Sequence, residues 1–97
     1  MFVLLGRYAR PLEEADAEVI ARHRAYLDSQ IAGGRVLVSG PREPRTGGLI
    51  VANVPDRPSA EALIDGDPFV SQGIATYELV EFHASMAMYA ELVESKA

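Results

Sequence analysis

The chain holds one histidine in a position suited to proton transfer, His23. The segment from Leu12 to Ala32 lacks Gly and Pro, which predicts a helix, and at about 100° per residue His23 falls within its apolar stripe. An imidazole that faces a core needs a hydrogen-bond partner, because an unpaired buried polar group is costly. A backbone carbonyl or a water molecule could be that partner. The functional alternative is a general base or acid that works near neutral pH. The stripe consists of Leu12, Val19, Ile20, Leu27 and Ile31.

Asp67 is the candidate partner for this histidine. It precedes Pro68, and an Asp-Pro pair typically begins a helical turn, with the carboxylate as N-cap and the proline at the first helical position. Capping alone would account for the residue. The two roles are compatible, however, since one carboxylate oxygen can accept a backbone N–H while the other orients an imidazole. Spacing along the chain leaves open whether His23 and Asp67 meet.

Ser39 and Arg7 are candidate substrate-binding residues at the ends of two predicted strands. Ser39 could donate a hydrogen bond at the mouth of a cleft, and Arg7 could bind a substrate carboxylate bidentately. An ordinary strand-end serine and an arginine that reaches solvent are the alternatives. By alternation Arg7 shares a face with Val3 and Leu5, whereas Tyr8 faces the other side and is expected to pack.

Three further polar residues are weaker candidates. Arg42 and Arg45 lie in a loop rich in proline and could attract an anionic ligand, although a solvated loop also explains them. His83 ends the last predicted strand and is expected at an edge or an interface.

Composition excludes several classes of chemistry. The 97 residues include no Cys, which rules out disulfides, thiolate metal sites and a cysteine nucleophile, and two histidines are too few for a three-histidine metal site. The nucleotide-binding and hydrolase motifs GxGxxG, P-loop, HExxH and GxSxG are missing. The net charge of −5 argues against nucleic acid and an anionic membrane surface as partners, and the apolar run at residues 2–5 is too short for a membrane span. We therefore expect no metal, no cofactor, no nucleic acid and no membrane.

Glycine and proline divide the chain into short elements. Apolar runs predict strands over residues 2–8, 35–39, 48–54 and 76–83. Helices are predicted over residues 12–32, 59–65 and 86–94, with one further turn over residues 67–73. This β-α-β-β-α-β order is the ferredoxin-like, α+β arrangement, an antiparallel four-stranded sheet with both helices on one face.

The predicted strands are more apolar than one covered face requires. Residues 2–5, 36–38 and 49–52 are unbroken apolar runs, whereas a solvated second face would show alternating polar residues. One interpretation is apolar surface left exposed. The other is that a second copy covers the open face, so that two chains stack their sheets into a dimeric α/β barrel. We expect a homodimer.

Several short motifs resemble the YCII-related (YciI-like) family. They are Gly66-Asp67-Pro68-Phe69, the closing strand Tyr77 to Phe82, His23 followed by Leu27, and Ser39-Gly40-Pro41. The likeness runs from Phe2 to about Phe82. It implies a ferredoxin-like fold, dimeric α/β barrel pairing and a His–Asp pair in a cleft. We expect a YCII-like domain over residues 1–84 and a C-terminal tail over residues 85–97, a helix that docks on the sheet edge or on the partner.

The resemblance also suggests a function. His23 and Asp67 would form a dyad that transfers a proton on a small molecule, aromatic or carboxylate-bearing, in a cytoplasmic lyase (dehydrohalogenase) or isomerase. The alternative is a non-catalytic module whose cleft holds a ligand or whose dimer pairs with a neighbouring protein.

Overall fold

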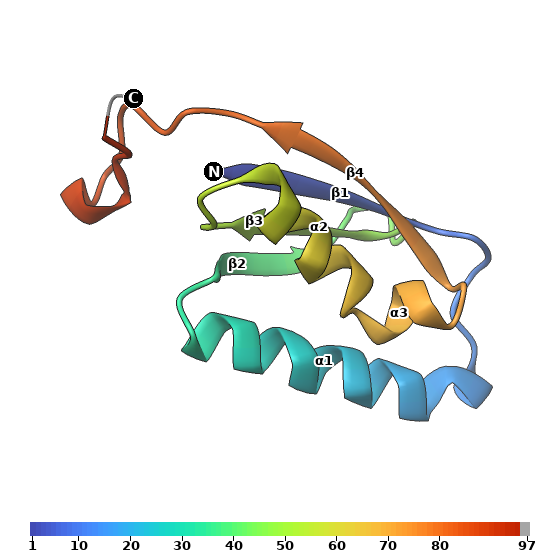
Figure 1. The fold of residues 1–97 in the computed structure, drawn as a ribbon. Coiled ribbons are helices and arrows are strands. Elements are labelled where there is room, and N and C mark those ends of the chain that lie inside the picture. Colours follow the sequence, from blue (N-terminus) through green and yellow to red (C-terminus); the bar gives the residue numbers. More distant parts are fainter. Residues whose placement is uncertain (96–97) are drawn as a thin grey trace.

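The computed structural model describes residues 1–95, in which three helices lie on one face of a four-stranded sheet (Figure 1). The strand order is β2-β3-β1-β4, and every neighbouring pair is antiparallel. This confirms the ferredoxin-like, α+β fold expected from the sequence. The strands are β1 (Phe2–Tyr8), β2 (Val36–Pro41), β3 (Gly48–Ala52) and β4 (Ala75–Glu81). The helices are α1 (Ala17–Ala32), α2 (Arg57–Asp65) and α3 (Pro68–Ser71), with short 3-10 helices at Glu14–Asp16 and Ala90–Leu92.

The first helix begins later than predicted. α1 starts at Ala17 and not at Leu12, because a hydrogen-bond network around Asp16 shapes the chain ahead of it. The two carboxylate oxygens of Asp16 accept hydrogen bonds from the Arg10 guanidinium, both at 2.8 Å, and one of them also accepts from the Glu13 backbone N–H at 2.8 Å. These hydrogen bonds lower the pKa of the Asp16 carboxyl to about 2. The ion pair thus ties the segment after β1 to the start of α1.

Aspartate caps begin the two shorter helices. The predicted N-cap Ser59 lies inside α2; the residue that caps this helix is Asp56, whose carboxylate accepts from the Ser59 backbone N–H at 2.9 Å. The turn predicted over residues 67–73 contains the short helix α3. Asp67 caps it by accepting from the Phe69 backbone N–H at 2.9 Å, as the Asp-Pro pair predicts.

The core lies between the helices and the sheet in two clusters. The larger cluster joins buried residues of β1 and β3 to Leu27 of α1 and Leu63 of α2. The smaller cluster surrounds Phe69 of α3, with Val19 of α1 against it. Because Phe69 and Leu27 also reach the site described below, the same packing that stabilises the helices positions the site.

The other face of the sheet, which we call the open face, is apolar. Its apolar side chains come from all four strands and are adjacent in register, since Val3 pairs with both Val51 and Val80. Val38 and Val80 are 58% and 40% exposed. In the described part of the chain no helix covers this face (Figure 1). Its apolar residues are Val3, Leu5, Val38, Leu49, Val51 and Val80.

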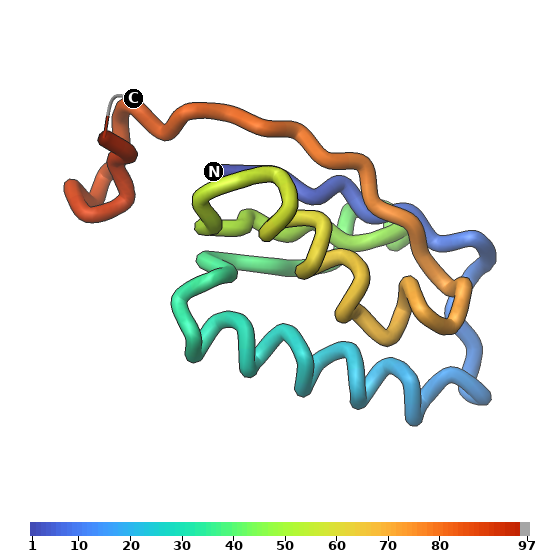
Figure 2. The backbone as a smooth tube through the Cα atoms, in the orientation of Figure 1, coloured from blue at the N-terminus to red at the C-terminus, as the bar shows by residue number. Residues whose placement is uncertain are grey.

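The tail after β4 is not the predicted helix over residues 86–94. It is extended, with a single 3-10 turn at Ala90–Leu92, and Met86 and Met88 are 89% and 91% exposed. The tail returns to the beginning of β1, where the Glu94 carboxylate accepts from the amino group of Met1 at 2.8 Å (Figure 2). A helix this short is marginal in water unless an apolar face packs. Within residues 1–95, both methionines are left almost fully exposed.

Candidate active site

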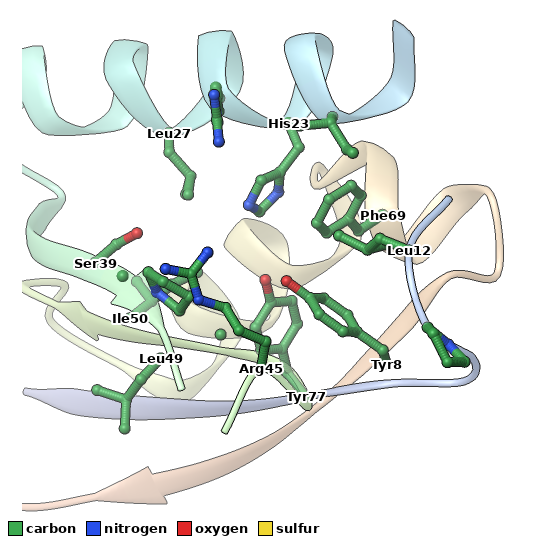
Figure 3. Close-up of a pocket in the computed structure, with 16 residues that line it drawn as sticks. Tyr8, Leu12, His23, Leu27, Ser39, Arg45, Leu49, Ile50, Phe69 and Tyr77 are labelled. Carbon is green, nitrogen blue, oxygen red and sulfur yellow. The ribbon is translucent and has the colours of Figure 1, made fainter. Parts of the chain in front are cut away.

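A pocket of about 620 Å³ lies between α1, α3 and the helix-covered face of the sheet (Figure 3). Most of its lining is apolar, with Leu12, Ile20 and Leu27 on one side and Ile50 on the other. Polar side chains from separate elements reach the same space. They are Tyr8 of β1, His23 and Arg24 of α1, Ser39 of β2, Arg45 of the β2–β3 connection and Tyr77 of β4.

The structure brings the two predicted dyad residues together. The Nδ1 atom of His23 lies 2.7 Å from Oδ1 of Asp67, although 44 residues separate them in the chain. The imidazole is 15% exposed and lines the pocket, whereas the Asp67 side chain is 2% exposed and lies behind it. With Nδ1 engaged by the carboxylate, Nε2 is the ring nitrogen left for a ligand in the pocket.

Asp67 accepts two hydrogen bonds besides that of His23. Its Oδ1 accepts from the Phe69 backbone N–H at 2.9 Å, and its Oδ2 accepts from the Tyr77 hydroxyl at 2.8 Å. Oδ1 of Asp67 therefore both caps α3 and contacts His23, while Tyr77 holds Oδ2. A buried carboxylate is stable only when its oxygens are hydrogen-bonded. With Asp67 ionised, His23 donates from Nδ1 and presents the lone pair of Nε2, the form a general base requires.

Phe69 fixes the plane of the imidazole. The two rings stack with centroids 3.9 Å apart and an angle of 5° between their planes. Tyr8 packs edge-on against the Phe69 ring, with centroids 6.0 Å apart and an interplanar angle of 85°. Phe69 follows Asp67 and Pro68 in the same turn, so a single short segment supplies both the carboxylate and the stacking ring.

The Tyr77 phenol is held in its neutral form. Burial raises its pKa well above the usual value of 10.0, and the charge of Asp67 and the hydrogen bond to it raise the pKa further. Tyr77 therefore acts as a hydrogen-bond donor to Asp67. It is a positioning residue for the dyad.

The remaining predicted residues are divided between two regions. Ser39 lines the pocket, as expected of a serine at its mouth. Arg7 does not: it follows Val3 and Leu5 onto the other side of β1, pairs with Thr76 and lines a neighbouring pocket with Tyr8 and Arg45. Its binding of a substrate carboxylate stays a prediction. The alternation of side chains along β1 already indicated that Arg7 lies on the face opposite to the helices.

Sequence reasoning missed Tyr77 and underrated Tyr8. Tyr8 packs as expected, but it also lines the pocket. Tyr77 precedes Leu79 by two positions in β4, so both face the helices. That alternation was a usable signal for Tyr77. The contact with Asp67, ten residues away, was not readable from spacing.

Within residues 1–95, no group of three His, Asp or Glu side chains is arranged to hold a metal ion. None of the described helices has the length and apolar character needed to cross a membrane.

Comparison with known proteins identifies the family. The model of the YCII-related domain matches residues 1–83, which is most of the chain, and the protein belongs to this family. The tail beyond residue 83 lies outside the match. No curated protein matches the chain.

A solved structure shares the fold. It is the 5-chloro-2-hydroxyhydroquinone dehydrochlorinase TftG of Burkholderia phenoliruptrix AC1100, in complex with 2,5-dihydroxybenzoquinone. The sequences are 22% identical, the TM-score is 0.67, and the alignment covers 84% of this chain and 93% of that one. At this identity the similarity establishes the fold.

Proposed function

We propose that this protein is an enzyme that transfers a proton on a small, ring-shaped substrate, with His23 as the general base and Asp67 as the residue that orients it. The single observation that carries the proposal is the 2.7 Å contact between Nδ1 and Oδ1, made at the wall of a pocket that the imidazole lines. A histidine held only for packing has no need of a buried carboxylate and a stacked ring.

The chemistry follows from these groups. Nε2 of His23 takes a proton from a hydroxyl or a C–H group of the substrate, and the electron pair of that bond moves into the ring system. In an elimination from a chlorinated hydroquinone, this proton is returned to the ring carbon that bears chlorine, which gives a keto tautomer. His23 then takes the proton of a second hydroxyl, the electron pair moves through the ring and expels chloride, and HCl is lost overall. In an isomerisation, His23 returns the proton to another atom. Asp67 stabilises the imidazolium formed in between.

Two further observations favour a lyase of this kind. The fold is shared with TftG, which is a dehydrochlorinase and is bound to 2,5-dihydroxybenzoquinone. The pocket has apolar walls of leucine and isoleucine, which suit the faces of such a ring.

Chloride release tests the function. Purified protein is supplied with 5-chloro-2-hydroxyhydroquinone and other chlorinated hydroquinones, and free chloride is measured over time. We expect the His23→Gln variant to lose about 10²- to 10⁴-fold in kcat, the usual contribution of a general base. His83→Gln is the matched control, because it removes the other histidine, which lies outside the pocket.

Unchanged turnover in His23→Gln would refute the dyad. If the wild-type protein binds these rings in the pocket and releases no chloride from any of them, the non-catalytic ligand-binding module becomes the better assignment.

We also propose that the functional unit is a homodimer in which two open faces stack. The apolar residues of this face form one continuous patch over all four strands. Exposed contiguous apolar surface is characteristic of a protein interface. A second copy presents the same patch and is therefore a self-complementary partner.

A further inference from the structure

The charged side chains at the pocket are all basic. Arg24 and Arg45 are among the lining residues, and no Asp or Glu is. Over the whole chain the balance is opposite, with 14 acidic residues against 9 basic ones. Asp67, the carboxylate behind His23, is occupied by three donors. Basic side chains therefore predominate in this part of an acidic protein, where Arg7 and Arg10 also line a neighbouring pocket together with Arg45, an arrangement that attracts anions.

The guanidinium of Arg45, unlike that of Arg42, does not hold the loop to the sheet. The neighbouring Arg42 donates to the Gly6 carbonyl at 3.3 Å and so ties the loop to β1. Arg45 instead meets Glu43 at 3.6 Å through Nε, with side-chain exposures of 72% and 77%. An ion pair exposed to this degree contributes little, and the pair leaves the two Nη groups available for a ligand.

The base of the loop holds Arg45 over the pocket. The Tyr8 backbone N–H donates to the Thr46 carbonyl at 2.8 Å, and the Arg42 backbone N–H donates to the Gly47 carbonyl at 2.9 Å. In Figure 3 the Arg45 guanidinium extends into the space that His23 faces from the opposite side, and Ser39 stands beside it.

We propose that Arg45, supported by Arg24, binds a planar oxyanion of the substrate, a carboxylate or a phenolate, while the ring lies against His23. This inference rests on the proposed function and specifies its substrate class as anionic. A guanidinium suits such a group because its fork of donors matches two coplanar oxygens, or accepts one delocalised oxyanion through charge-assisted hydrogen bonds. The proposed recognition residue thus comes from the β2–β3 connection, whereas Arg7 lies outside the lining of the pocket that His23 faces.

Binding of ring probes tests the inference without a known substrate. Isotope-labelled protein is titrated with benzoate, with 4-nitrophenolate and with neutral benzamide, and amide shifts around the pocket are followed by NMR. We expect both anions to bind more tightly than benzamide. In Arg45→Gln the anions should bind about tenfold more weakly, the scale of a charged hydrogen bond, while benzamide is unaffected. The tighter of the two anions tells carboxylate from phenolate.

Two control variants separate this inference from the proposed function. Arg57→Gln removes an exposed arginine of α2 that pairs with Glu61, so anion binding should match that of the wild type. His23→Gln should abolish turnover yet retain anion binding through Arg45. The inference is overturned if Arg45→Gln binds benzoate as the wild type does, if benzamide binds as well as benzoate, or if benzoate shifts no pocket residue.

Discussion

Asp67 does two jobs with one carboxylate. It caps α3 through the Phe69 N–H and orients His23 through the same oxygen, while Tyr77 holds the second oxygen. Replacing Asp67 therefore disturbs the turn that carries the stacking Phe69 as well as the dyad. Substitution of His23 separates the proposed catalysis from folding more cleanly, because His23 supplies no cap.

The buried Tyr77 phenol is expected to make the stability of the protein depend on pH. Tyr77→Phe leaves a buried oxygen of Asp67 without its donor, so we expect the variant to be about 1–3 kcal/mol less stable near neutral pH. The pKa of Tyr77 is raised in the folded state, so the folded protein keeps this proton above about pH 10 while the unfolded chain releases it. The stability that Tyr77 contributes is therefore lost as pH rises. The gap between wild type and variant should narrow above about pH 10.

Urea unfolding at a series of pH values from neutral to alkaline measures this gap. Tyr89→Phe, at a tyrosine of the tail that is 59% exposed, is the matched control and should follow the wild-type curve at every pH. A gap between Tyr77→Phe and wild type that stays constant through the alkaline range would contradict the prediction.

At this scale the candidate site was partly predictable. The apolar stripe placed His23 toward the sheet, and the Asp-Pro pair placed Asp67 at a helix start; both side chains lie so in the structure. Periodicity could not predict their contact, because it describes one element and this pair bridges two; only the family resemblance implied such a pair. Tyr77 was missed for the same reason, and Arg45 was named only as a weaker candidate, because the surroundings of each depend on a neighbouring element.

The β2–β3 connection is the element that joins the sheet to the site. Its last residue before β3, Gly47, is buried against β1, where a Cβ would collide with the Gly6 carbonyl oxygen and come within 2.8 Å of the Arg7 Cα. Backbone lies on both sides of this contact, so no side chain can move away to relieve it.

We expect Gly47→Ala to lower the free energy of unfolding by about 1–3 kcal/mol, as overpacking does. It should also weaken benzoate binding, because the loop that carries Arg45 must shift. Gly48→Ala is the control for stability, since its Cβ would lie 3.5 Å from the Gly40 carbonyl oxygen, an ordinary contact. Thermal unfolding of both variants measures the difference, and equal stability of the two would count against this close approach.

Local signals explain which elements were predictable. Strands and helices with apolar patterning and glycine or proline at their ends were found, because these features act within a few residues. The start of α1 was wrong because the Arg10–Asp16 ion pair reshapes five residues that have good helix propensity. The tail helix was wrong because its methionine pattern indicates a packing face, whereas Met86 and Met88 pack against no other element among the residues that the structure describes.

At the scale of the whole molecule, the open face is the surface on which the proposed homodimer depends. If two copies stack through it, Val51→Glu at its centre places a charge in each half of a symmetric interface, where burial without a partner is strongly unfavourable. We expect this variant to sediment as a monomer at micromolar concentration, while the wild type sediments as a dimer. Ala21→Glu, on the exposed side of α1, should leave the dimer intact. A monomeric wild-type protein would remove the dimer from the proposal.

The double use of Asp67 has a consequence for reading related chains. A chain of this fold that has abandoned proton transfer still needs a side-chain acceptor ahead of α3, so its Asp-Pro-Phe turn can persist for mechanical reasons alone. His23 has no comparable structural role, because its imidazole caps no helix and makes no hydrogen bond to the backbone of the described residues. Among chains that share the turn, the residue at the position of His23 therefore distinguishes candidate enzymes from chains that keep the fold without the catalytic group.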